Sequence, residues 1–261
     1  LPKAPSAYNP IVNPKRAMQR RDYILLRMRE QNYITEAEYN EAIQTPNSAS
    51  IHRTEANQYA EYVAEMVRLA VIERFGQQDA YNQGYHVYTT LDSEAQKNAV
   101  EVLREQLMAY DQRHGYRGAE NKLNLSDFKT HDALVAELAT YTVLGNLQPA
   151  VVLESDKQAR LLLNTDDEIT LTLAQVEWAR HFVNADKRGS KPTRVNDVLK
   201  AGDIVRVRNQ DEKGYQLSQL PRVTGATVLL DAKDGAIRAL TGGFDYTQSK
   251  FNRAVQARRP P

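Results

Sequence analysis

The spacing of apolar residues changes near Tyr141, and this change constrains the fold more than any other feature of the chain. Before it, apolar residues recur at helical spacing, most clearly from Thr54 to Gly76. After it come short apolar runs separated by polar turns, a pattern typical of strands. The sequence therefore predicts an α+β chain in which a helix-rich part precedes a β-rich part.

The β-rich part is predicted to contain strands at residues 150–153, 159–163, 168–173, 203–207 and 215–220. A short helix is expected at residues 176–180. Short strands with turn signals between them favour a small antiparallel β-barrel or sandwich. The predicted core consists of apolar residues of these strands: Val151, Leu153, Leu161, Leu163, Ile169, Leu171, Val205, Val207 and Leu217.

Local signals mark several element boundaries. Asn13-Pro14 predicts a helix start, because Asn is a favoured N-cap and Pro is tolerated at the first helical position. Thr35–Glu38 and Ser93–Gln96 each have the form of a capping box. Tyr85 to Leu91 is rich in Tyr, Val and Thr, so we expect a strand there.

Near the end of the chain, residues 226–230 and 236–240 are apolar runs on either side of Asp234-Gly235. An Asp-Gly pair between two such runs is a strong hairpin signal, because Gly tolerates the positive φ that tight turns need. We therefore expect a β-hairpin to begin a new unit after Val223.

Composition excludes several classes of protein. The formal net charge is +1, and residues 141–222 contain twelve Lys or Arg and eleven Asp or Glu, so non-specific binding of nucleic acid is not expected. Because the chain has no cysteine, disulfides and thiolate metal sites are excluded. No apolar run approaches the roughly 18 residues that span a bilayer, and the first residues lack the apolar core of a signal peptide. Any membrane anchor is expected outside this stretch.

Residues that could carry chemistry are few. Ser126-Asp127-Phe128-Lys129 matches the Ser-x-x-Lys pattern of serine acyl-enzymes, but the Ser-x-Asn and Lys-Thr-Gly patterns that accompany it are absent. We therefore interpret Ser126 as part of a turn or a helix cap. The histidines have no metal-site spacing, and Asp166-Asp167-Glu168 is expected to be a solvated turn. No metal and no cofactor are expected.

The first 30 residues are basic, with seven Lys or Arg and two Asp or Glu. Lys15 and Arg16 fall in a predicted first helical turn, where the helix dipole disfavours cations. This placement favours an anionic partner, such as a carboxylate or a substrate phosphate. A solvated basic face is the alternative, since each dipole interaction contributes only about 0.3–1 kcal/mol.

Two stretches resemble class A penicillin-binding proteins. Arg20–Leu25, with the preceding Leu1–Ser6, is similar to the end of the family's peptidoglycan glycosyltransferase domain, whose last signature has two arginines followed by aliphatic residues. The stretch from Asp231 to Arg259, which includes Gly242-Gly243 and Phe251-Asn252-Arg253-Ala254, resembles the start of the transpeptidase domain. Between them, Tyr85–Asp92 and Tyr110–Gly118 look like the family's linker.

The resemblance implies an order of domains along the chain. Residues 1–50 would be the C-terminal end of the glycosyltransferase domain, and 51–140 a helix-rich linker. Residues 141–222 would be a small antiparallel OB-like β-barrel, and 223–261 would start the transpeptidase domain with its first hairpin.

The resemblance also implies the activity of the parent protein, a bifunctional peptidoglycan synthase. Such enzymes polymerise glycan chains from lipid II and cross-link stem peptides through an acyl-serine intermediate. Their catalytic glutamate belongs to an earlier motif that is absent here, and their serine follows a few residues after the position of Ala257. We therefore expect no catalytic residue in this stretch, and no reaction of the stretch alone with penicillin.

Arg20 and Arg21 are the expected supporting residues of the glycosyltransferase domain. Neighbouring helix positions diverge by about 100°, so one of the two should face the domain interior. Arg20 is favoured, because Ala17, Ile24 and Met28 share its side of the helix.

The implied partners are lipid II and stem peptides at the flanking domains and β-lactams at the transpeptidase domain, on the periplasmic face of the inner membrane. Envelope regulatory proteins that dock on the OB-like domain are an alternative role for this stretch. A nucleic-acid-binding OB protein is a second alternative, disfavoured by the balanced charge and the few aromatic residues.

Overall fold

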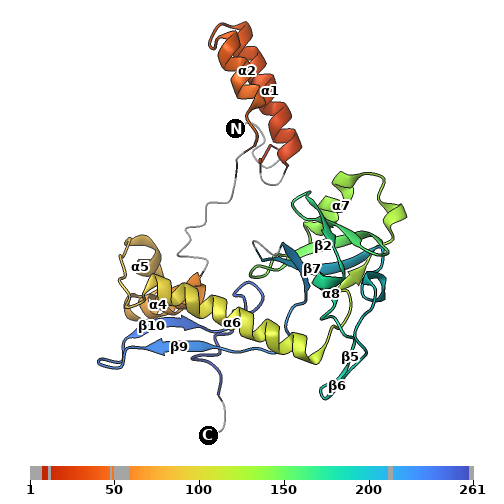
Figure 1. Cartoon of the computed structure of the whole chain (residues 1–261). Coiled ribbons are helices and arrows are strands. Elements are labelled where there is room, and N and C mark those ends of the chain that lie inside the picture. The colour runs from red at the N-terminus through yellow and green to blue at the C-terminus, as the bar shows by residue number, and fades with distance from the viewer. Residues whose placement is uncertain (1–7, 11–12, 48, 50–58, 211–213, 259–261) are drawn as a thin grey trace. The chain divides into compact units, whose positions relative to one another are not determined.

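The computed structural model describes residues 8–10, 13–47, 49, 59–210 and 214–258 (Figure 1). The chain divides into two compact units, residues 1–55 and 56–261. In the described residues, the first unit contains helices only, and the second contains the remaining helices and all the strands.

The first unit contains helices α1 (Pro14–Glu30) and α2 (Glu36–Gln44). The predicted start at Asn13-Pro14 is confirmed, with Asn13 at the N-cap and Pro14 opening the helix. The capping box of α2 is also confirmed: the Glu38 amide donates to Thr35 Oγ1 at 3.3 Å, and the Thr35 amide donates to Glu38 Oε2 at 2.7 Å. The Thr35 amide lowers the pKa of Glu38, because its hydrogen bond stabilises the carboxylate.

The second unit begins with three helices, α4 (Glu61–Phe75), α5 (Gln77–Asn82) and α6 (Ser93–His114). The helix expected from Thr54 to Gly76 is confirmed over α4, and its first residues lie outside the described part of the chain. The capping box expected at Ser93–Gln96 is wrong. Asp92 is the N-cap and accepts from the Ala95 amide at 2.8 Å, while Gln96 is buried and bonded elsewhere.

The strand expected at Tyr85–Leu91 is also wrong, since these residues join no ladder. They are extended and mostly exposed, and Tyr88 keeps 92% of its surface accessible. Their end runs beside the last strand of the chain, where Thr90 Oγ1 donates to the Ile237 carbonyl at 2.8 Å. The segment has a composition typical of strands, but it has too few backbone hydrogen-bond partners to join a sheet.

The β-rich part forms one six-stranded antiparallel sheet (Figure 1). Its pairing path is β1-β7-β2-β3-β4, and β8 also pairs with β7. The strands are β1 (Asn121–Lys122), β2 (Gln148–Ser155), β3 (Ala159–Leu163), β4 (Glu168–Leu171), β7 (Asp203–Asn209) and β8 (Tyr215–Ser218). All the strands predicted between 150 and 220 are present. In the described residues no pairing closes the sheet into a ring, so the structure shows an antiparallel sheet and not a closed barrel.

Two helices pack on this sheet. Helix α7 (His131–Leu138) covers one face through the fully buried Leu138. Helix α8 (Leu173–Val176) lies directly after β4, earlier than the short helix expected at 176–180. The Thr172 hydroxyl and Gln175 form its capping box, which explains the earlier start.

The core of the sheet matches most of the predicted residues. Residues of the predicted set that are nearly or fully buried are Val151, Leu161, Leu163, Leu171, Val205, Val207 and Leu217. Leu153 and Ile169 are only partly buried and pack at the margins of the core. Trp178 also packs there, and its indole Nε1 donates to the Leu217 carbonyl at 2.9 Å.

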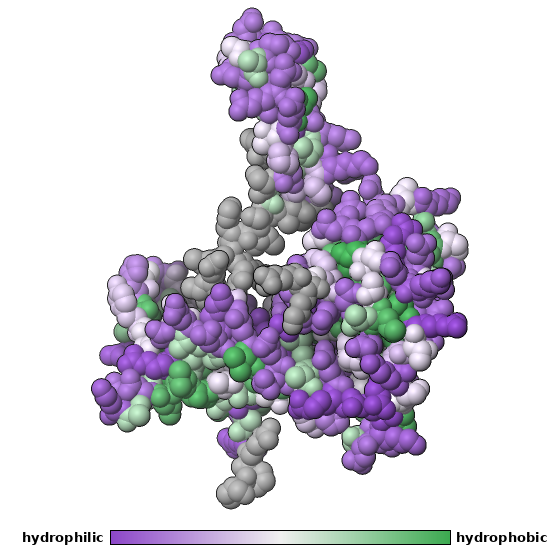
Figure 2. Space-filling model, in the orientation of Figure 1, coloured by the Kyte–Doolittle hydropathy of each residue, from purple (hydrophilic) through white to green (hydrophobic). Residues whose placement is uncertain are grey.

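Two further strand pairs lie outside the main sheet. Strands β5 (Phe182–Asn184) and β6 (Lys187–Arg188) form a short hairpin. Strands β9 (Thr227–Leu230) and β10 (Ile237–Thr241) pair antiparallel around a turn in which Gly235 has φ of 73°. Figure 2 shows apolar surface over β9, where Val228, Leu229 and Leu230 are exposed. No helix in the described residues has the length and apolar character needed to cross a bilayer.

Candidate functional site

Ser126 lies in a short 3-10 helix, Leu125–Asp127. It is exposed, and its Oγ donates to Asn124 Oδ1 at 3.0 Å. Lys129, the other member of the Ser-x-x-Lys pattern, is also exposed. This local arrangement agrees with the interpretation of Ser126 as part of a turn.

Arg21 joins the two helices of the first unit. Its guanidinium donates to the carbonyls of Thr45 at 2.5 Å and Ile43 at 3.1 Å, just where α2 ends, and its Nε donates to Asp22 at 2.9 Å. A cation suits this position because the last carbonyls of a helix carry partial negative charge. Arg21 also lines a hollow of about 490 Å³ between α1 and the segment that follows α2.

Arg20 has a different environment. Its guanidinium lies over two aromatic rings, 5.8 Å from the centroid of Tyr8 and 5.5 Å from that of Tyr23. Aromatic faces attract cations without neutralising them.

No group of three or more His, Asp or Glu side chains suitable for a metal ion occurs in the described residues. His131, at the start of α7, lies between two carboxylates, with Nδ1 3.1 Å from Asp166 and Nε2 3.3 Å from Glu168. Each carboxylate contacts a different ring nitrogen. The two nitrogens of one imidazole ring point in opposite directions, so His131 and the two carboxylates cannot all bind one metal ion. The acidic turn at Asp166 is exposed, as expected.

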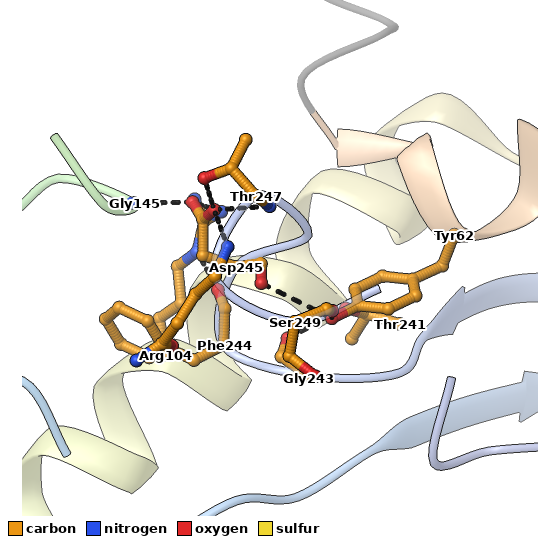
Figure 3. Close-up of polar contacts among 10 residues, drawn as sticks. Tyr62, Arg104, Gly145, Thr241, Gly243, Phe244, Asp245, Thr247 and Ser249 are labelled. Atoms are coloured by element: carbon orange, nitrogen blue, oxygen red, sulfur yellow. Dashed lines mark hydrogen bonds and ion pairs between the residues drawn. The ribbon is translucent and has the colours of Figure 1, made fainter. Parts of the chain in front are cut away.

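A dense set of polar contacts is found in the loop after β10, residues 242–253, which we call the junction loop (Figure 3). Asp245 lies at its centre and is nearly buried, with 10% of its side chain exposed. One carboxylate oxygen accepts from the Gly145 amide at 2.8 Å and lies 3.5 Å from Arg104. The other accepts from the amide and hydroxyl of Thr247, at 2.9 and 2.5 Å. The junction loop is therefore tied to α6 and to the turn before β2.

Two glycines allow this close packing. A Cβ on Gly242 would lie 2.4 Å from Asn252 Oδ1, and one on Gly243 would lie 2.4 Å from the Tyr62 hydroxyl. Real Cβ atoms essentially never lie this close to another heavy atom, so any other residue at either position would force neighbouring atoms to shift. The Gly-Gly pair of the sequence thus has a steric cause.

Tyr62 of α4 also holds the junction loop in place. Its hydroxyl donates to the Ser249 carbonyl at 2.7 Å (Figure 3). Burial raises the pKa of Tyr62 to about 12, because the phenolate would lose its hydration. The hydroxyl therefore remains a donor throughout the physiological range.

The end of α6 is fixed by a second polar cluster, in the stretch Tyr110–Gly118. Arg117 Nη1 donates to Asp111 Oδ2 at 2.7 Å, and the two side chains are 17% and 5% exposed. Gln219, after β8, donates to the Gly115 carbonyl at 2.9 Å and accepts from the Arg117 amide at 3.0 Å. These contacts attach the end of α6 to the segment that follows β8.

These two clusters can hold segments together, but they contain no arrangement for group transfer. Every carboxylate, guanidinium and amide named in them is bonded to backbone or to an opposite charge. The site is therefore a mechanical junction between helices, sheet domain and hairpin.

Comparison with known proteins identifies the family. The model of the penicillin-binding protein OB-like domain matches residues 116–223. Penicillin-binding protein 1A of Pseudomonas aeruginosa is 41% identical over 262 residues, which cover 100% of this chain and 31% of that protein. The chain belongs to the class A penicillin-binding proteins. Penicillin-binding protein 1A of Escherichia coli is 38% identical, over 99% of this chain and 31% of that protein. The chain therefore spans about a third of the length of the curated relatives that it matches.

A solved structure supports the same assignment to the class A penicillin-binding proteins. The crystal structure of penicillin-binding protein 1A from Haemophilus influenzae matches with a TM-score of 0.69 and 35% identity, over 98% of this chain and 36% of that one. The resemblance read from the two sequence motifs is thereby confirmed.

Sequence reasoning missed most of the junction of this penicillin-binding protein segment. Asp245 and Arg104 carry its contacts, and neither was singled out as a candidate. A signal for Asp245 existed, because Gly242-Gly243 marked a close approach of backbone two residues earlier. The Arg20 and Arg21 roles stay a prediction, since nothing in the described contacts bears on polymerisation.

Proposed function

We propose that this stretch is the non-catalytic centre of a bifunctional peptidoglycan synthase. It would hold a glycosyltransferase domain and a serine transpeptidase domain, which act on lipid II and stem peptides, in a fixed relation. The observation that carries the proposal is Asp245, which ties the junction loop to the turn before β2 through a carboxylate that is 10% exposed. A buried charge paired in this way resists separation of the segments that it joins.

The proposed division of the chain follows the same assignment. Residues 1–50 would end the glycosyltransferase domain, 51–140 link it, 141–222 form the OB-like domain and 223–261 start the transpeptidase domain. We propose that the OB-like sheet is barrel-like, because Leu171 of β4 and Leu217 of β8 share one core cluster although their strands are not paired. The β9–β10 hairpin would be the first of the transpeptidase domain.

We propose that the parent protein acts on the periplasmic face of the inner membrane, anchored outside this chain, and that β-lactams acylate its transpeptidase serine. Arg20 would support polymerisation by contacting a substrate phosphate or a carboxylate of its pocket. Arg21 is the weaker candidate, because its guanidinium is already bonded to the end of α2.

Glycan synthesis from lipid II by the purified full-length protein tests this function. Arg20→Ala should reduce polymerisation at least tenfold, while Arg27→Ala, an exposed arginine of the same helix, should leave it within twofold. Penicillin acylation is the folding control and should be unchanged in both. Full polymerase activity in Arg20→Ala would leave the solvated-face interpretation standing, and a wild-type protein without polymerase activity would contradict the function itself.

Docking of envelope regulatory proteins is a second proposed role of the OB-like domain. The β5–β6 hairpin supports it, because it lies outside the main sheet and exposes Val183 with Lys187 and Arg188. Binding of purified envelope proteins to the full-length protein, with and without substitution of Val183 by Asp, would test this role. A salt-dependent shift with single-stranded oligonucleotide would instead favour nucleic-acid binding.

A further inference from the structure

The two carboxylate oxygens of Asp245 serve two different segments (Figure 3). Oδ1 accepts from the Thr247 amide at 2.9 Å, the Thr247 hydroxyl at 2.5 Å and the Gln248 amide at 3.4 Å. Oδ2 accepts from the Gly145 amide at 2.8 Å and lies 3.5 Å from Arg104 Nη2. Oδ1 therefore accepts hydrogen bonds from within the junction loop, and Oδ2 attaches that loop to the OB-like domain.

The donor on the OB-like side is held in a fixed position. Gly145 has φ of 59° in a turn closed by two bonds, from the Leu147 amide to the Leu144 carbonyl at 3.0 Å and in the reverse direction at 3.4 Å. Leu147 is fully buried and directly precedes β2. The Gly145 amide is thus an extension of the sheet, and Asp245 binds to a rigid element.

Arg104 of α6 completes the tie. Its Nε donates to the Phe244 carbonyl at 2.8 Å, so the same guanidinium contacts the backbone before Asp245 and the carboxylate of Asp245. Arg104 and Asp245 have 15% and 10% of their side chains exposed. Because a buried carboxylate is stable only while it stays paired, the loop cannot leave Gly145 and Arg104 without a large loss of stability.

Further contacts fix the junction loop on the C-terminal side of Asp245. Beyond Gln248, the Ser249 carbonyl accepts from Tyr62 at 2.7 Å, and the Arg253 amide donates to the Gly242 carbonyl at 3.2 Å. Residues 245–253 are therefore held at both ends and in the middle. The direction in which the chain continues past Arg253 depends on these contacts.

We propose that Asp245 is a positioning residue for acyl transfer, acting through the junction loop on the serine expected a few residues beyond Ala257. The inference rests on the proposed transpeptidase function. Asp245 would touch neither substrate nor serine. Its effect would be geometric, because displacement of a reacting group by about 1 Å can reduce a rate about 100-fold.

The test is Asp245→Asn in the full-length protein. The amide oxygen can keep the bonds to Thr247 and Gln248, but the NH₂ group then faces the Gly145 N–H, so that two donors meet. The matched control is Glu105→Gln, which weakens another contact between α6 and the OB-like domain, to Arg208 at 2.9 Å, and leaves the junction loop intact. Three quantities are measured: the second-order rate of acylation by a fluorescent penicillin, glycan synthesis from lipid II, and the melting temperature.

We expect Asp245→Asn to slow acylation at least tenfold, with glycan synthesis within twofold of wild type and a single cooperative unfolding transition that is shifted to lower temperature by loss of the buried pair. Glu105→Gln should leave both activities within twofold. If Asp245→Asn does not fold, Arg104→Lys decides, because it keeps the charge and removes the forked contact; acylation should then slow at least threefold.

Two results would overturn the inference. One is acylation at the wild-type rate in the variant that folds. The other is loss of acylation and glycan synthesis in equal proportion with a lowered melting temperature, which a merely structural residue would give. A wild-type protein that polymerises glycan but is not acylated at all would contradict the proposed function, and is distinguishable from both.

Discussion

Gln96 of α6 bonds to both backbone polar groups of Leu240 in β10: its Nε2 donates to the Leu240 carbonyl at 2.9 Å, and its Oε1 accepts from the Leu240 amide at 2.8 Å. A side-chain amide thus replaces the neighbouring strand that β10 lacks on this edge. Gln96 is 3% exposed and Leu240 is 1% exposed, so water cannot replace these bonds.

Gln96→Leu should therefore destabilise the chain by about 2–6 kcal/mol, since it leaves a buried amide and a buried carbonyl unpaired at about 1–3 kcal/mol each. Urea unfolding measures the loss. Gln106→Leu, the same substitution at an exposed position of the same helix, should change the free energy of unfolding by less than about 0.5 kcal/mol. Equal losses in the two variants would show that the Leu240 contacts do not stabilise the fold.

Asp111 and Arg117 form the most deeply buried ion pair at the end of α6, at 2.7 Å. Asp111→Asn should cost about 3–5 kcal/mol, because it leaves a buried guanidinium without its counter-charge. Glu154→Gln removes one carboxylate from the exposed Arg160 and should cost less than about 1 kcal/mol. Both losses are read from urea unfolding, and a loss below 1 kcal/mol at Asp111 would contradict the structural role of the pair.

Tyr62 predicts a loss of stability at alkaline pH. Its pKa is raised to about 12 by burial, above the value of about 10 in an unfolded chain. The unfolded state therefore loses the proton first, and the contribution of Tyr62 is fully present below pH 10 and lost as pH rises towards 12.

Comparison of variants isolates this contribution. The difference in free energy of unfolding between wild type and Tyr62→Phe should shrink between pH 9 and pH 12. Tyr88→Phe, at a residue 92% exposed, should show a constant difference. A Tyr62→Phe difference that does not change with pH would exclude a buried, neutral Tyr62.

Arg21 should stabilise α2 through the carbonyls of Ile43 and Thr45. In Arg21→Ala, amide hydrogen exchange in α2 should accelerate about tenfold or more, as expected for loss of hydrogen bonds from a charged donor worth about 1.5–3 kcal/mol. Arg27→Ala is the control, since its contact with Glu30 is within one helix and exposed. If amide exchange in α2 is unchanged in Arg21→Ala, Arg21 does not stabilise α2. It would then be as strong a candidate as Arg20 for supporting polymerisation.

The sequence predicted elements well where local signals and burial agree. The strands at 159–163 and 203–207 are short, mostly buried apolar runs between polar turns, and the box Thr35–Glu38 is a local hydrogen-bond pattern; both kinds of signal are visible in the sequence. Gln96 shows where such reasoning fails. It has the spacing of a capping box with Ser93, but the partner that decides its position is Leu240, 144 residues away.

The junction could not be predicted for the same reason. Asp245 lies 100 residues after Gly145 and 141 after Arg104, and the three meet only when the sheet domain and α6 are assembled. The strand expected at Tyr85–Leu91 failed in the opposite way, because its composition was right but the fold gave it too few partners. The sheet is not closed into a barrel because β4 and β8 do not pair in the described residues. Strand propensity does not determine how closely two such strands approach each other.

Mapping of the penicillin adduct in the full-length protein tests the central claim, that this chain supports two active sites and contains neither. The protein is labelled with a fluorescent penicillin, digested, and the acylated peptide is identified by mass. We predict a single adduct on a serine beyond Arg259, with Ser126 unlabelled and residues 1–261 alone unreactive. An adduct on Ser126, or on any residue of this chain, would contradict the account.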